Sequence, residues 1–201
     1  MQSLSPLDLV SFYTQLRDPT GQGAKEITEI LRNFLQNPES ISTLFEVHAN
    51  AEDSVIRTIA TINIRDYLLI HKATISEQNI QAIRDQIIQC LEKETDNTTI
   101  LQIIKVISIL VNSYKSRWPK LDSFVFTPNY INHLSTILQI MVFLFPIFTN
   151  EEIQEKSEYF SALLLTGFQI DNFKINCNTL SFLFSILLRS DDFGQFAAFQ
   201  E

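Results

Sequence analysis

The residues that could carry chemistry in this 201-residue chain are few and scattered. No histidine among His48, His71 and His133 has a second ligand at a metal-binding spacing such as HxxxH. No local pattern suggests a Ser-His-Asp or Cys-His nucleophile. The segment Gly21-Gln22-Gly23 lacks the lysine and the third glycine of a phosphate-binding loop. We therefore expect no catalytic residues, no cofactor and no metal site.

Charge and cysteine usage narrow the classes of partner. The formal net charge is −8 and the pI is near 4.9. An acidic surface repels phosphate backbones, so we expect no direct nucleic-acid binding. The charge suits a partner that presents basic segments, or it serves solubility alone. Cys90 and Cys177 lie far apart without CxxC spacing, which is typical of buried thiols in a reducing compartment.

One strongly apolar stretch resembles a membrane span without reaching its length. Residues 134–148 fall short of the roughly 18 residues that cross a bilayer, and they include Pro146. A buried core helix is the better interpretation. The first nine residues have no basic region followed by an apolar block, so they predict no signal peptide. We expect no membrane insertion.

The elements that must position these residues are helices. Apolar residues recur at helical spacing, and four glycines and six prolines are too few for a chain of tight turns. Ser54 and Ser76 have the residue type of helix N-caps, and Pro146 should end or bend a helix. The expected helices span residues 4–16, 22–37, 39–47, 54–69, 77–93, 99–114, 129–148, 151–168 and 178–189.

The spacing of the turns predicts stacked helix pairs. Turn sequences recur at residues 18–19, 51–53 and 96–97, about 35 and then 43 residues apart. Two helices per period of about 40 residues are typical of HEAT or armadillo repeats. We therefore expect an all-α fold, a HEAT/armadillo-like α-solenoid of antiparallel helix pairs. An ordinary helical bundle is the alternative.

Three segments in this order resemble a known family. They are residues 31–38 (LRNFLQNP), residues 52–68 (EDSVIRTIATINIRDYL), and residues 92–121, which end in a Trp-Pro-x-Leu step at Trp118 and Pro119. Together they resemble the amino-terminal domain of the importin-β (karyopherin-β) nuclear transport receptors. Lys120 departs from the family, which often has an acid there, and residues 98–101 lack its usual Val-Arg pair.

The resemblance implies a domain organisation. Residues 1–125 are expected to form importin-β-like HEAT repeats, and residues 126–201 to form further helical repeats of a truncated array. The apolar character of the last residues favours truncation, although these phenylalanines could instead pack back on the last helix. They are Phe182, Phe184, Phe193, Phe196 and Phe199.

The resemblance also implies a function in nucleocytoplasmic protein import. The expected partners are the small GTPase Ran in its GTP form, cargo proteins with basic signals, and nucleoporins. The expected locations are the cytoplasm, the nucleus and the nuclear pore. Coupling between Ran and cargo would run through the curvature of the repeat array. The alternative is a generic HEAT-repeat scaffold for complex assembly that is not linked to Ran.

Arg57, Thr61 and Arg65 are the residues that the resemblance implies for Ran binding. Together with Thr58 they share a polar helix face by i, i+4 spacing, and we expect that face to line the concave groove. For Arg57 the alternative is structural, an Asp–Arg ladder between adjacent repeats, and for Arg65 it is a solvated side chain. Asp53, Trp118 and Pro119 are expected to be structural signatures.

Overall fold

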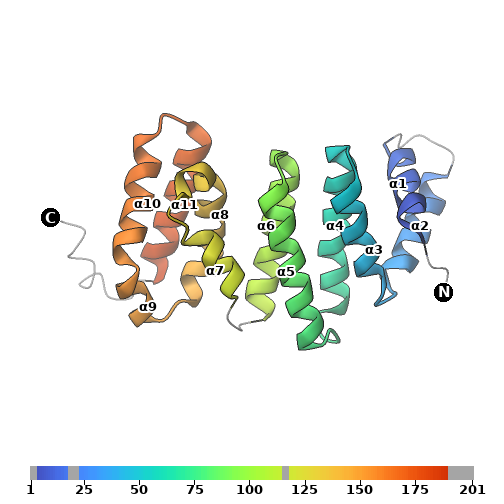
Figure 1. The fold of residues 1–201 in the computed structure, drawn as a ribbon, viewed down its shortest axis with the longest axis horizontal. Helices are drawn as coiled ribbons and strands as arrows, with labels where there is room; N and C mark the ends of the chain where they lie inside the picture. Colours follow the sequence, from blue (N-terminus) through green and yellow to red (C-terminus); the bar gives the residue numbers. More distant parts are fainter. Residues whose placement is uncertain (1–3, 18–22, 115–117, 190–201) are drawn as a thin grey trace. The chain divides into compact units, whose positions relative to one another are not determined.

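Side-chain caps mark several of the helix starts in the computed structural model, which describes residues 4–17, 23–114 and 118–189 (Figure 1). Ser5 and Asp8 form a reciprocal capping box at the first helix. The Ser76 hydroxyl accepts from the Asn79 amide at 3.3 Å, as expected for this cap. Asp53, rather than the expected Ser54, is the N-cap of the helix Ser54–His71, because its carboxylate accepts from the Val55 amide at 2.8 Å.

Every element of the described residues is helical, which confirms the all-α class. The chain divides into two compact units, Met1–Ser113 (unit 1) and Tyr114–Glu201 (unit 2). The boundary between these compact units lies at residues 113–114, and the expected division into 1–125 and 126–201 stays a prediction. The helices of unit 1 are α1 (Pro6–Gln15), α2 (Ala24–Leu35), α3 (Ser40–Asn50), α4 (Ser54–His71), α5 (Glu77–Lys93) and α6 (Asn97–Ser113).

The helices of unit 1 pack in two rows. The odd-numbered helices contact one another in chain order, and so do the even-numbered helices. Helix α4 packs against α3 of its own pair and against α6 of the next (Figure 1). Three-residue connections at 51–53 and 94–96 join α3 to α4 and α5 to α6, so the helices of each pair run in opposite directions. The expected turn at 18–19 lies outside the described residues.

Unit 2 is built from shorter elements than the sequence predicts. The expected helix 129–148 is divided into three parts, and Pro146 lies in the last of them, so the predicted break is confirmed. The expected helix 151–168 is interrupted at Lys156. The elements are α7 (Pro119–Val125), η1 (Tyr130–His133), α8 (Leu134–Leu144), η2 (Phe145–Ile147), α9 (Asn150–Glu155), α10 (Ser157–Gln169) and α11 (Phe173–Arg189).

Two starts in unit 2 were not predicted. Helix α7 follows the Trp-Pro step, with Pro119 in its first turn. Helix α11 begins five residues before the expected position 178, and the Asn172 side chain accepts from the Ile175 amide at 3.1 Å. A carboxamide acceptor one turn ahead of a helix stabilises its free amide groups.

Aromatic rings fill the centre of unit 2. Phe145, Phe160 and Phe182 are buried, and their ring centroids lie 5.3 to 6.1 Å apart in edge-to-face arrangements. Such pairs contribute about 0.5–1.5 kcal/mol beyond their area. Six buried residues of α8 extend this core. By length and composition alone, the segment Tyr130–Ile147, which contains α8, could cross a membrane.

Helix α11 exposes large apolar side chains on its outer side. Phe173 is 85% exposed, Leu188 69% and Phe184 60%. Of the other phenylalanines in the expected apolar tail, Phe182 is buried, whereas Phe193, Phe196 and Phe199 lie outside the described residues.

Candidate functional site

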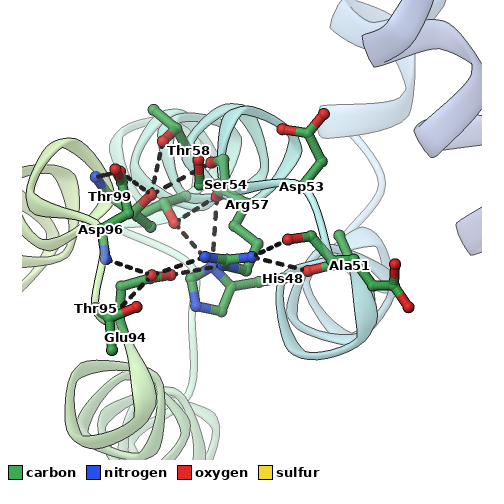
Figure 2. Close-up of polar contacts among 12 residues, drawn as sticks. His48, Ala51, Asp53, Ser54, Arg57, Thr58, Glu94, Thr95, Asp96 and Thr99 are labelled. Carbon is green, nitrogen blue, oxygen red and sulfur yellow. Dashed lines mark hydrogen bonds and ion pairs between the residues drawn. The ribbon is translucent and has the colours of Figure 1, made fainter.

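Arg57 is the centre of a polar junction between α4 and the turn that precedes α6 (Figure 2). Its Nε and Nη2 atoms donate to the two carboxylate oxygens of Glu94, at 2.8 and 2.9 Å. Its Nη1 atom donates to the backbone carbonyls of Ala51 (3.1 Å) and Glu52 (2.7 Å). The guanidinium therefore ties the turn of the second helix pair to the turn of the third. This bidentate geometry requires arginine rather than lysine.

Glu94 is the buried partner of this pair. Its side chain is 2% exposed, against 19% for Arg57. The Oε1 atom also accepts from the backbone amides of Thr95 and Asp96, both at 2.9 Å. Burial alone would raise the pKa of Glu94, but the hydrogen bonds from Arg57 and these two amides outweigh it and lower the pKa to about 2. The Glu94 carboxylate is therefore charged at neutral pH, and both of its oxygens accept hydrogen bonds.

His48 and Thr61 extend the junction into the core. The Thr61 hydroxyl donates to the Arg57 carbonyl at 2.8 Å, and His48 Nδ1 lies 3.0 Å from the Thr61 oxygen. This arrangement assigns the ring proton to Nδ1, because the hydroxyl proton is already committed. Burial lowers the pKa of His48, against the opposing influence of its backbone hydrogen bond and of Glu94. The imidazole is therefore neutral in the folded protein at neutral pH.

Hydroxyl groups align α4 with α6 beside the ion pair. Asp96 is the N-cap of α6 and accepts from both the amide and the hydroxyl of Thr99, each at 2.9 Å. The Thr99 hydroxyl also lies 2.7 Å from that of Thr58 on α4. Thr99 is completely buried, so these contacts fix the axial position of one helix against the other (Figure 2).

The residues predicted for binding do not share one accessible face. Thr61 is 0% exposed, so the expectation that it lines a groove is wrong, because α4 is covered by neighbours on two sides. Arg57 is committed to Glu94. Arg65 is elsewhere: its Nε and Nη2 donate to Asp66 Oδ1 at 3.0 and 2.8 Å, and its side chain is 29% exposed. Of the three residues, Arg65 has the most exposed side chain.

Asp53 does not pair with Arg57, four residues later. It caps α4 and forms an ion pair with Arg17, which lies in the turn after α1, within the first helix pair. The hydrogen bond from Arg17 is the main cause that lowers the pKa of Asp53, and the Val55 amide adds to it. Two ion pairs therefore link successive helix pairs, with sequence separations of 36 and 37 residues.

Trp118 and Pro119 start α7. Trp118 is 4% exposed, and its carbonyl accepts the first helical hydrogen bond, from the Asp122 amide at 3.0 Å. Pro119 occupies the first turn, where its missing N–H costs nothing. Both residues therefore have a local structural role.

Sequence patterns did not predict that Glu94, His48 and Thr99 belong to the junction. A usable signal exists for Glu94: it follows Arg57 by 37 residues, close to the 36 residues between Arg17 and Asp53. The described ranges contain no group of three histidine, cysteine or acidic side chains that could hold a metal ion. The chain is thus an all-α protein whose candidate site is a joint between helix pairs. No protein-family model, curated protein or solved structure matches it.

Proposed function

We propose that the chain is a segment of a helical-repeat receptor of the importin-β type, which binds the small GTPase Ran in its GTP form. The observation that carries this proposal is the repeated joint of unit 1. An arginine of one helix pair meets an acid of the next at Arg17–Asp53 and again at Arg57–Glu94. A joint that recurs at the period of the helix pairs supports HEAT/armadillo-like repeats.

The two-row packing of unit 1 supports a binding scaffold. Because odd-numbered and even-numbered helices contact their own kind in chain order, each row can present a continuous surface to a large partner. Repeat arrays recognise proteins through such extended surfaces. Cargo proteins with basic signals and nucleoporins are further proposed partners, in the cytoplasm, the nucleus and the nuclear pore, and they rest on the sequence resemblance alone.

A Ran pull-down tests the proposal. The purified chain is immobilised and offered Ran loaded with a non-hydrolysable GTP analogue or with GDP. We expect stronger retention of the GTP form. Equal retention, or none, would contradict the Ran assignment.

Arg65 gives the matched variants for this test. Arg65→Ala should weaken Ran-GTP binding about tenfold if Arg65 is an interface anchor. Arg32→Ala is the control, because Arg32 also lies on an even-numbered helix and also pairs with a nearby acid, Glu29. Arg57 and Thr61 are poor test positions, since their replacement disturbs the junction.

A generic HEAT-repeat scaffold is the second candidate. It is favoured by the commitment of Arg57 and Thr61 to contacts within the chain, which matches the structural alternative for Arg57. This scaffold would assemble other proteins without any dependence on the nucleotide state of Ran.

A further inference from the structure

Helix α11 has two faces of different character. Its inner face packs on α8 and α10 and includes Thr179, Phe182 and Ile186, which are buried. Its outer face, which we call the α11 stripe, consists of exposed side chains that are either apolar or small. They are Phe173, Cys177, Leu180, Ser181, Phe184, Leu187 and Leu188. Large exposed apolar patches on folded proteins mark contact surfaces, so this stripe is a candidate interface.

The spacing of the α11 stripe fits a facing helix. Intervals of four, three, four and three residues separate Phe173, Cys177, Leu180, Phe184 and Leu187. This repeat keeps one seam of a helix against another helix that crosses it at a shallow angle. The stripe also contains a hollow of about 440 Å³, lined by Leu180, Ser181, Leu183, Phe184 and Leu187. Four of these residues are spaced i, i+3, i+4 and i+7, the arrangement that receives one side chain of a facing helix.

The order of large and small side chains on the stripe favours a second copy of α11 that runs antiparallel. When two copies are aligned with Leu180 opposite the partner's Ser181, Phe184 lies opposite the partner's Cys177. A two-fold axis makes each of these pairs occur twice. Both pairs set a large side chain against a small one, and such alternation lets two facing layers interdigitate. A parallel alignment would instead set Phe184 against Phe184 and Cys177 against Cys177.

The polar groups of the stripe can be covered at little cost. The Ser181 hydroxyl already donates to the Cys177 carbonyl at 2.9 Å, and a free cysteine behaves as a small apolar side chain. Helix α11 contains no acidic residue, and Lys174 lies at the edge of the stripe. In the antiparallel alignment Lys174 meets the partner's Leu187, so its stem covers apolar surface while its ammonium group stays in water.

We propose that the chain forms an antiparallel homodimer through the α11 stripe, with Cys177 of each copy against the partner's Phe184. The outer pair, Phe173 against the partner's Leu188, extends the contact to both ends of the helix. One helix face per copy is a small interface, so we expect a dissociation constant of roughly 10–100 μM. Each copy carries a net charge of −8, so added salt should strengthen the dimer by screening the repulsion. This proposal does not rest on Ran binding, because Arg65 belongs to unit 1.

Sedimentation velocity over a range of chain concentrations tests for the dimer. Phe184 is 60% exposed, so Phe184→Glu should keep the fold and weaken dimerisation at least about tenfold by placing a charge in the contact. Leu165→Glu is the matched control, because Leu165 is 63% exposed on α10. It precedes Gly167, which faces Thr179 of α11, by two residues, and therefore lies on roughly the opposite side of α10. Circular dichroism checks that both variants are folded.

Disulfide formation tests the antiparallel alignment. In Phe184→Cys the new thiol lies opposite the partner's Cys177, so mild oxidation should yield a covalent dimer. Within one chain the two positions are about 10.5 Å apart along the helix, too far for a disulfide. The double variant Phe184→Cys, Cys177→Ser should give no covalent dimer, because equal positions of the two copies are also about 10.5 Å apart along the axis. Cys90 is present in both variants and cannot cause a difference between them.

Three results would overturn the proposal. The first is a chain that sediments as a monomer at every concentration, as expected if a helix of another protein, a further segment of this chain or a lipid surface covers the stripe instead. The second is equal dimerisation of Phe184→Glu and Leu165→Glu, which would place the contact elsewhere. The third is a covalent dimer of Phe184→Cys that persists without Cys177, as a parallel pair of helices would give.

Discussion

Each of the two units is stabilised internally by a different kind of contact. In unit 1, directional polar contacts join one helix pair to the next, and the Arg57–Glu94 ion pair is more buried than the Arg17–Asp53 ion pair. In unit 2, a cluster of buried rings around Phe160 joins η2, α10 and α11. Polar contacts fix the register of one helix against another, whereas rings mainly fill volume.

The difference has a physical consequence for the packing of helix pairs. A bidentate arginine accepts one arrangement of its partner carboxylate, so an angle or a slide between helix pairs breaks two hydrogen bonds at once. Edge-to-face rings tolerate a range of centroid distances, here 5.2 to 6.5 Å. Unit 1 should therefore be specified by a few residues, and unit 2 by total core volume.

The largest expected effect is in the aromatic cluster. Phe160 is 1% exposed and contacts the rings of Phe145, Phe148 and Phe182. Phe160→Ala should lower the free energy of unfolding by about 4 kcal/mol through lost burial and the cavity left behind. Hydrogen exchange should show lost protection in α8, α10 and α11 but not in α4. Phe173→Ala, at an 85% exposed position, is the control and should change stability little.

Removal of Arg57 should be the most costly single change in unit 1. Arg57→Ala leaves the buried Glu94 carboxylate without its cation, which costs about 3 kcal/mol. Urea unfolding measures this loss, and Arg32→Ala should cost less than about 0.5 kcal/mol because its ion pair is exposed. The double variant Arg57→Met, Glu94→Leu should recover most of the stability, since neither charge is then buried. Equal losses in single and double variants would refute a joint based on charge.

Acid should weaken unit 1 in two pH windows. The pKa of Glu94 is lowered from 4.5 to about 2, so its stabilisation is complete above pH 4.5 and is lost as the pH falls from 4.5 toward 2. The full loss is about 3 kcal/mol. The lowered pKa of His48 means that stability also begins to fall below pH 6.5, where the unfolded chain binds the proton more readily. Stability measured against pH for Glu94→Gln should lose the lower window and keep the upper one.

The close approach of α10 and α11 tests whether unit 2 tolerates a change of volume. A Cβ atom on Gly167 would lie 2.1 Å from the Thr179 hydroxyl oxygen. Gly167→Ala should therefore destabilise unit 2 by about 1–2 kcal/mol, because overpacking outweighs the better helix propensity of alanine. Gly167→Ala combined with Thr179→Ala should regain part of the loss in thermal unfolding. If Gly167→Ala is instead more stable, the contact between α10 and α11 accommodates the added methyl group and the prediction is wrong.

Local sequence signals predict much of the fold. Ser76 marked the start of α5, and Pro146 marked a break, because caps and proline act on the backbone within one turn. The Arg57–Glu94 contact could not be read in the same way, since its partners are 37 residues apart. Thr61 is buried, although helical periodicity places it on a polar and therefore exposed face. Periodicity alone does not reveal that neighbours cover α4 on two sides.

Unit 2 was harder to predict for a related reason. The residues of α8 are apolar on most sides of the helix, so the helical period does not identify a single buried face. Neither residues 130–133 nor Lys156 is a glycine or a proline, so these interruptions have no breaker residue to announce them. Helix α7, with seven residues, is too short to show a periodic stripe.

A single hydroxyl in each unit gives the smallest and sharpest comparison. Tyr13 is 0% exposed, and its oxygen accepts from Asn63 on α4 at 2.6 Å. Tyr13→Phe should lower the free energy of unfolding by about 1 kcal/mol and reduce hydrogen-exchange protection in α1. Tyr130→Phe removes a hydroxyl that lies 3.1 Å from Thr166, while the ring can keep its contact with Tyr159. This second change should stay within about 0.5 kcal/mol. If both substitutions cost the same, polar contacts matter equally in the two units, and the contrast between a joint of hydrogen bonds and a core of rings is wrong.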